Sequence, residues 1–548
     1  MVKINTIDGV LLRDMIIAGT TMLQNNREKV DALNVFPVPD GDTGTNMTLT
    51  IQSATKEVNS KELLRANEAA NAIAKGALRG ARGNSGVILS QLFRGFAKEL
   101  KDVESITPSK FALALDRGAK TAYKAVMKPK EGTILTVARV IAEEALKQVE
   151  KDPDNYEALF DCILSTGEDI LAKTQQMLPA LKQAGVVDSG GTGLLYIYIG
   201  YASVIKGEKL PDGDVISSHA ESLEEFVDDH DKIEEIKFTY CNEFTIKNLN
   251  PDTNDEIIDR FRRRLNRIGD TVFVKKSDEI INVLVHSNEP GRVLQYALEL
   301  GEISDIKIIN ILDERRQKEE KPVELKKYGM VAVSLGEGFN QIYKELSVDK
   351  VVDGGQTMNP SIDDLSKAIE SVNAETIYVF PNNGNIIMAA EQAAKISEKK
   401  VYVLRTKNVA MGISAAIAFQ ENADAETNLK RMTEAAEQVR TGMVTYAIRD
   451  TVFEDLDIKK DDIIGLTNGK ITKKGNDILT VAAELMKDIV TENDELISIY
   501  YGNDVDESSA NKLCDLLSST YSHCDVEVQY GGQPLYYYLI SVEWDLMK

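Results

Sequence analysis

The sequence is poor in cysteine, tryptophan and histidine, and its charge is strongly of one sign. The 548 residues include four cysteines, one tryptophan and four histidines, with a net charge of −23 and a pI near 4.8. The cysteines form no CxxC pair, so we expect no disulfide framework and predict a reducing, cytoplasmic location. The acidic balance argues against nucleic acid or an anionic membrane as the main partner.

Long apolar runs are also missing. No run approaches 18 apolar residues, so we predict no integral membrane contact. The N-terminal apolar stretch is broken by Arg13 and Asp14 and lacks a small-residue cleavage site, which argues against a signal peptide. The chain is too long for one hydrophobic core, and its length predicts three or four domains.

The two commonest nucleotide-binding motifs are absent. No GxxxxGK[ST] occurs, because Gly465–Lys470 is one residue short of it, and there is no protein-kinase motif set. All four histidines lie beyond residue 205. A general base for an alcohol acceptor would then be a carboxylate, whereas a carboxylate acceptor is already ionised and needs no base.

The segment NVFPVPDGDTGTNM, residues 34–47, is the strongest positive feature. Its two prolines disfavour helix, so Asp40 and Asp42 lie on an extended or turn segment and project to the same side. The residues Thr43–Asn46 then begin a helix, whose free N–H groups can bind an anion. Carboxylates beside such amides hold Mg²⁺ on a nucleotide. The alternative is that both aspartates are only helix caps.

Three further loops join helices in residues 1–205, which we predict to be almost wholly helical. GARGNSG places open backbone at a helix start, although an ordinary glycine turn is the alternative. EGTILTV supplies a helix-entry hydroxyl for which a capping role is favoured. VVDSGGTG again combines a carboxylate with open backbone. Together the loops predict a helical bundle with one functional rim. Their candidate residues are Arg82, Asn84, Ser85, Gly86, Thr133, Asp188 and Gly190.

These four motifs resemble the nucleotide-binding subunit of dihydroxyacetone kinases and, more closely, the bacterial fatty acid kinase catalytic subunit, over the whole chain. The resemblance implies an eight-helix barrel that binds ATP or ADP through two Mg²⁺ ions. It implies Asp40 and Asp42 as metal ligands, and Thr43 with them as catalytic residues. The third metal-binding aspartate of the family is Val35 here, and Asn34 is a candidate replacement. The implied cofactor-binding residues of this segment are Asn34, Thr43, Gly44, Thr45 and Asn46.

After an acidic linker (206–236), the periodicity changes to two, which predicts a small α+β middle domain over 237–312. Cys241 and His286 lie on predicted strands. The resemblance implies a cysteine and a His-x-His pattern here, but this chain reads Leu284-Val285-His286. A Zn²⁺ site on Cys241 and His286 is one interpretation, and a buried core cysteine with a structural histidine is the other.

A charged linker (313–327) leads to residues 328–548, where strands alternate with helices. This alternation predicts an α/β region with a parallel sheet and ligand-binding loops at the strand ends, including Gly354–Ser361. By resemblance, the region is similar to the DegV-like lipid carriers. It is predicted to dock such a carrier or to hold a degenerate acyl site, and the alternative is that its loops only cap strands.

Three functions follow. The first is ATP-dependent phosphorylation of a fatty acid carboxylate, presented by a DegV-like carrier, to acyl phosphate for phospholipid synthesis. The second is that of a small-polyol kinase component of the dihydroxyacetone type, and the third is that of a non-catalytic nucleotide sensor. A homodimer is expected only because two-fold pairs are the commonest assembly.

Overall fold

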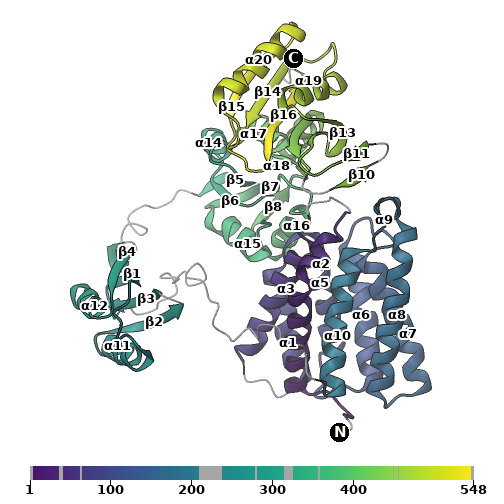
Figure 1. The fold of residues 1–548 in the computed structure, drawn as a ribbon, viewed down its shortest axis with the longest axis vertical. Coiled ribbons are helices and arrows are strands. Elements are labelled where there is room, and N and C mark those ends of the chain that lie inside the picture. Colours follow the sequence, from purple (N-terminus) through teal and green to yellow (C-terminus); the bar gives the residue numbers. More distant parts are fainter. Residues whose placement is uncertain are drawn as a thin grey trace. The chain divides into compact units, whose positions relative to one another are not determined.

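The computed structural model describes residues 4–35, 41–61, 65–208, 237–277, 280–313, 325–355, 358–447, 450–453 and 456–544. The chain divides into two compact units, Met1–Val215 with Leu325–Lys548, and Ile216–Glu324. It contains a helical N-terminal region, a middle unit with strands and an α/β C-terminal region (Figure 1). The predicted fold class is confirmed. Most of both predicted linkers lies outside the described residues.

The described part of the N-terminal region contains eight helices of 15 residues or more. Each packs on the next along the chain, and the last returns to the first, which closes the predicted barrel. The short helices α2 (Arg27–Ala32) and α9 (Pro179–Ala184) lie in two of the connections. The eight are α1 (Gly9–Asn25), α3 (Thr43–Asn59), α4 (Ala66–Gly80), α5 (Gly83–Glu99), α6 (Pro108–Ala125), α7 (Ile134–Lys151), α8 (Tyr156–Met177) and α10 (Ser189–Lys206).

Apolar side chains at helical spacing fill the barrel. Met15, Ile51, Phe111, Ile141 and Ile197 are fully buried in one continuous core. Because the long helices alternate in direction, α3, α5, α7 and α10 all begin at one end of the barrel, near α2 and α9 (Figure 1). Nowhere in the described ranges is a helix both long and apolar enough to span a membrane.

The middle unit is a four-stranded antiparallel sheet with two helices, as predicted. The strand order is β2-β3-β1-β4. Phe244 and Val283 pack with Phe261 and Val293 of the helices to form its core. The elements are β1 (Tyr240–Lys247), α11 (Asp255–Ile268), β2 (Gly269–Ser277), β3 (Ile280–Ser287), α12 (Pro290–Ala297) and β4 (Glu302–Asn310).

The C-terminal region holds two sheets. The first is parallel, in the order β6-β5-β7-β8, and confirms the predicted strand–helix alternation. Its strands are β5 (Lys326–Ser334), β6 (Lys350–Asp353), β7 (Ala374–Phe380) and β8 (Lys400–Val403). The helices that follow are α14 (Glu337–Glu345), α15 (Ile362–Ser371), α16 (Ile387–Ile396), α17 (Val409–Ile417) and α18 (Ala425–Gln438).

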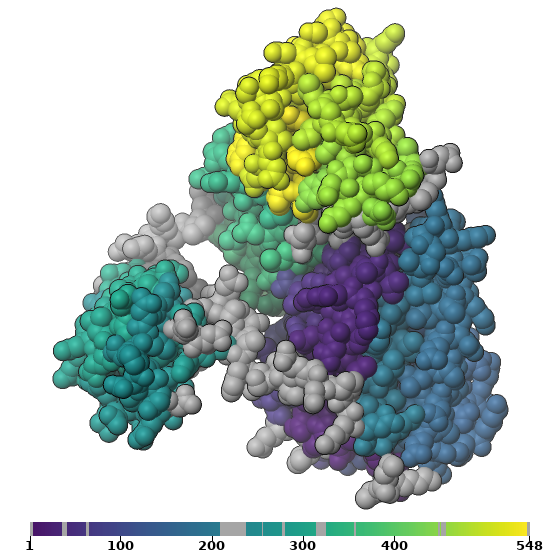
Figure 2. Space-filling model, viewed as in Figure 1, coloured from purple at the N-terminus to yellow at the C-terminus, as the bar shows by residue number. Residues whose placement is uncertain are grey.

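The second sheet is mixed and mostly antiparallel, in the order β13-β12-β9-β16-β14-β15. Its residues form a continuous yellow-green surface in Figure 2. The elements are β9 (Arg440–Tyr446), β12 (Ile463–Thr467), β13 (Lys470–Gly475), α19 (Ile478–Ile489), β14 (Leu496–Tyr501), α20 (Glu507–Thr520), β15 (Asp525–Tyr530) and β16 (Tyr536–Glu543), with a hairpin of β10 (Thr451–Phe453) and β11 (Leu456–Ile458).

Within the larger unit, the parallel sheet and the barrel share an apolar core. Helices α15 and α16 contact α4 and α5. Ala81 and Val87, at the start of α5, are fully buried with Val331, Ile362 and Leu365 of the C-terminal region. The start of α5 is therefore covered by the loops that follow the parallel strands.

Candidate functional site

Four helix N-termini meet at one rim of the barrel, and each carries a partial positive charge. The starts of α3 and α5 lie side by side. The Arg82 backbone N–H donates to Thr50 Oγ1 at 3.3 Å, and a Cβ on Gly86 would lie 2.3 Å from the same oxygen. Gly86 is thus required for the close approach of α5 to α3.

Asp42 is the described member of the predicted metal pair, because Asp40 lies outside the described residues. Asp42 occupies the N-cap position of α3, yet in the described structure its carboxylate makes no capping hydrogen bond to that helix. Its Oδ2 instead accepts a 2.6 Å hydrogen bond from Nδ2 of Asn359, 317 residues along the chain. The cap-only interpretation does not describe Asp42.

The other residues predicted at the start of α3 separate into two groups. Thr43 and Asn46 are buried beside Asp42, and Asn46 Oδ1 lies 3.4 Å from Asn359 Nδ2. Thr45 faces away from Asn359, since Asp31 accepts from both its backbone N–H (3.0 Å) and its hydroxyl (2.9 Å).

Asp31 of α2 is a residue that the sequence analysis missed. Its contact with Thr45 spans 14 residues and follows no helical or strand spacing. Gly44 packs on the same helix, because a Cβ there would lie 2.4 Å from the Arg27 carbonyl oxygen. The predicted metal substitute Asn34 is 2% exposed, and its backbone N–H donates to the Asp31 carbonyl.

The GARGNSG loop is turned toward the C-terminal region. Arg82 donates to the Asn359 backbone carbonyl at 2.7 Å and lies 3.5 Å from the Asp364 carboxylate. Asn84 Nδ2 donates to Asn385 Oδ1 at 3.0 Å. Ser85 stays half-buried at the helix start. The two side chains predicted to bind phosphate thus contact loops that follow β6 and β7.

At the other side of the rim, Asp188 joins the starts of α7 and α10. Its Oδ2 accepts from the Gly191 N–H at 2.7 Å, and the Ile134 backbone also donates to the carboxylate. Gly190 lies directly against Ile134. Burial raises the pKa of Asp188 to about 7, although both backbone hydrogen bonds lower it. The carboxylate is therefore committed to holding the barrel.

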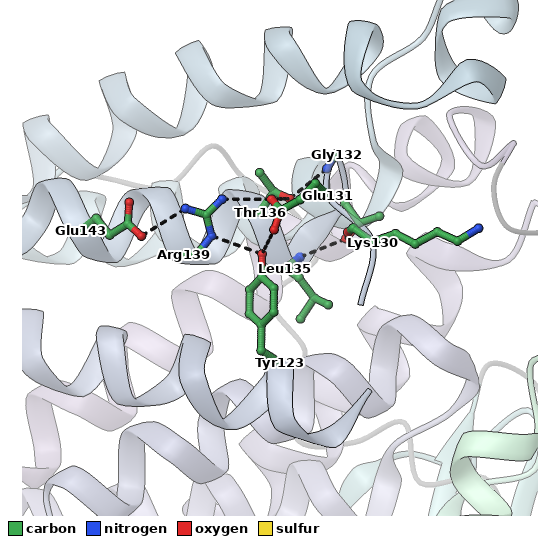
Figure 3. Close-up of polar contacts among 9 residues, drawn as sticks. Tyr123, Lys130, Glu131, Gly132, Leu135, Thr136, Arg139 and Glu143 are labelled. Atoms are coloured by element: carbon green, nitrogen blue, oxygen red, sulfur yellow. Dashed lines mark hydrogen bonds and ion pairs between the residues drawn. The ribbon is translucent and has the colours of Figure 1, made fainter. Parts of the chain in front are cut away.

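Thr133 is the N-cap of α7, where it accepts from the Leu135 N–H, so the structure gives it the capping role. Around it, Tyr123, Thr136 and Arg139 all point to Glu131 (Figure 3). Burial raises the pKa of Glu131, but hydrogen bonds from these three side chains outweigh it and hold that pKa below its usual value. This network braces the α6–α7 connection.

In the middle unit, Cys241 and His286 are direct cross-strand partners on β1 and β3, and both are buried. His286 Nδ1 lies 3.6 Å from Asp270 Oδ1. No group of three or more His, Cys, Asp or Glu side chains with metal-binding placement occurs in the described ranges. The Zn²⁺ interpretation therefore remains a prediction that rests on two residues.

The rim fits Mg²⁺ and a nucleotide at the α3–α5 side. A buried carboxylate that is not used as a cap lies beside two helix N-termini, and two amide side chains, Asn46 and Asn359, adjoin it. Hard oxygen ligands next to backbone N–H groups suit Mg²⁺ and phosphate.

Comparison with known proteins assigns each region to a family model. The DAK2 domain matches residues 37–203, the middle domain of FakA-like fatty acid kinase proteins matches 237–318, and their C-terminal domain matches 329–543. A dihydroxyacetone kinase from C. freundii is 19% identical over 37% of this chain and 36% of that chain, with a TM-score of 0.27, which supports no conclusion by itself.

Two relatives cover essentially the whole chain. Protein YloV of Bacillus subtilis is 42% identical over 99% of this chain and 100% of its own length. Protein SSP1546 of Staphylococcus saprophyticus is 40% identical over 98% of this chain and 100% of its own. The domain composition indicates a kinase-type phosphotransferase that uses ATP or ADP. The chain belongs to the FakA-like family of fatty acid kinase proteins.

Proposed function

We propose that the protein transfers the γ-phosphoryl group of ATP to the carboxylate of a fatty acid, which a separate DegV-like carrier presents, and so forms an acyl phosphate for phospholipid synthesis. The observation that carries the proposal is family membership along the full length, with a DAK2 domain at the N-terminus. The resemblance of the C-terminal region to DegV-like proteins supports a carrier partner.

The reaction requires positioning and charge stabilisation more than acid–base chemistry. A carboxylate oxygen attacks the γ-phosphorus, the bond from that phosphorus to the bridging oxygen breaks, and ADP leaves. No proton moves, because the acceptor is ionised at neutral pH. This agrees with a helical region that contains no histidine.

The rim residues have distinct roles in this proposal. Asp42, together with Asp40, holds Mg²⁺, which when bound neutralises charge on the β- and γ-phosphates. The N–H groups at Thr43, Ser85 and Gly86 bind and orient the phosphates at two helix N-termini.

The test incubates the full chain with ATP, Mg²⁺ and a DegV-family carrier loaded with oleate, and traps acyl phosphate with hydroxylamine. We expect oleoyl hydroxamate in proportion to ADP released, and none with the carrier emptied of lipid. ADP release that requires dihydroxyacetone instead, with no hydroxamate at any chain length, would overturn the acceptor assignment.

A further inference from the structure

The side-chain amide of Asn359 enters the α3–α5 rim from the C-terminal region. Asn359 follows β6 in the chain. Its Nδ2 lies 2.6 Å from Asp42 Oδ2 and 3.4 Å from Asn46 Oδ1. A Cβ on Gly83 would lie 3.5 Å from the same nitrogen. The amide therefore sits among the residues that the proposed function assigns to the cation and the nucleotide.

The atom assignment of this amide follows from chemistry. A carboxylate accepts hydrogen bonds and cannot donate one when ionised, so the amide atom 2.6 Å from Asp42 is the nitrogen. Its carbonyl oxygen, Oδ1, is then buried without a hydrogen-bond partner in the described structure, in a residue that is 2% exposed. An unpaired buried oxygen of this kind costs about 1–3 kcal/mol. Such a cost is typical of a site completed by a ligand.

Asn359 is held at the rim by its backbone and not only by this amide. Its carbonyl accepts from Arg82 at 2.7 Å, and the Ile362 N–H donates to the Ala81 carbonyl at 3.2 Å. Pro360 restricts the backbone of the residue before it. The apolar core around Ile362 and Ala81 fixes the same segment against α5. The amide thus remains beside Asp42 whichever of its two ends faces the carboxylate.

We propose that Asn359 is a ligand residue of the cation–nucleotide site, supplied by the C-terminal region. In the absence of a cation its Nδ2 donates to Asp42. A half-turn of the amide exchanges nitrogen for oxygen and presents Oδ1, a hard ligand of the kind Mg²⁺ accepts. This inference rests on the proposed function. It also explains why the barrel itself lacks a third carboxylate at Val35.

The test measures the Mg²⁺ concentration needed for half-maximal binding of a fluorescent ADP by the full chain and its variants. N359A loses the oxygen ligand, and we expect its Mg²⁺ requirement to rise about tenfold. N359D supplies a charged oxygen, so its requirement stays at or below that of the wild type. Without Mg²⁺, however, N359D unfolds at a lower temperature because two carboxylates then face each other.

The matched control is Asn428→Ala. Asn428 is a fully buried amide of the C-terminal region that exchanges two hydrogen bonds with the Gln420 backbone, so its loss costs stability alone. The inference is overturned if N359A stays within twofold of N428A, if N359A needs less Mg²⁺ than the wild type, or if N359D is impaired as strongly as N359A. A wild-type chain that binds no Mg²⁺-ADP would instead overturn the proposed function.

Discussion

Asp42 and Asp188 occupy the same position in two parts of one barrel, and their carboxylates do different things. Each is the N-cap residue of a long helix that begins at the shared rim. Asp188 accepts from the backbone of α10 and of α7. Asp42 leaves its own helix uncapped and meets Asn359 from outside the barrel. A carboxylate used by its own scaffold supports the fold, whereas one directed outward is available to a ligand.

The strongest way to break this comparison is to neutralise each carboxylate in turn. Asp42→Asn should lower acyl phosphate formation at least about a hundredfold, because a charged group directed at the reacting centre is lost. Its free energy of unfolding should change by less than about 1 kcal/mol, since the new amide oxygen still accepts from Asn359. Hydroxylamine trapping and urea denaturation of the same samples measure both quantities.

Asp188→Asn is the paired variant, and its pattern should be the reverse. We expect a clear change in stability and less than about a fivefold change in rate at a temperature where the variant is folded. If Asp42→Asn keeps near wild-type activity, or Asp188→Asn is the slower enzyme, the division of roles between the two aspartates is wrong.

The sequence predicts the barrel and the position of its rim, because helical periodicity and glycine loops are local features. It does not separate the two aspartates. Both precede a Gly-Thr-containing helix start, in DGDTGT and VVDSGGTG. What distinguishes them is the partner of each carboxylate. The Asn359 contact with Asp42 joins positions 317 residues apart, in regions that the sequence analysis treated as separate domains. Periodicity contains no information about such a pair.

The pH dependence of stability sharpens the comparison at Asp188. Burial raises its pKa to about 7 in the folded protein from 3.8, so between these values the native state retains a proton that the unfolded chain has lost. The native state binds more protons, and the free energy of unfolding therefore falls as pH rises. Relative to Asp188→Asn, wild-type stability should fall by about 1.4 kcal/mol per pH unit up to pH 7 and then level off.

Urea denaturation of both proteins from about pH 5.5 to 8, a range that spans the raised pKa, measures this difference. The Asp188→Asn protein is the reference, because it carries every other titrating group of the chain. A difference between the two proteins that stays constant with pH would mean that the two helix N-termini keep Asp188 ionised throughout, and that burial does not dominate its pKa.

The smallest effect concerns the glycines that bring the two regions together at the rim. Gly83 has a φ of +59°, and an added Cβ would lie 2.5 Å from Asn46 Nδ2, next to Asp42. Gly384, in the loop after β7, has open space around it. Gly83→Ala should cost about 1–2 kcal/mol from backbone strain and weaken Mg²⁺-ADP binding severalfold by displacing Asn46. Gly384→Ala should stay within about 0.5 kcal/mol and bind normally. Equal nucleotide affinity in both variants, measured by fluorescent ADP titration, would mean that the start of α5 does not position the ligand, and would leave Asp42 and Asn359 as the only link between the barrel rim and the C-terminal loops that matters for binding.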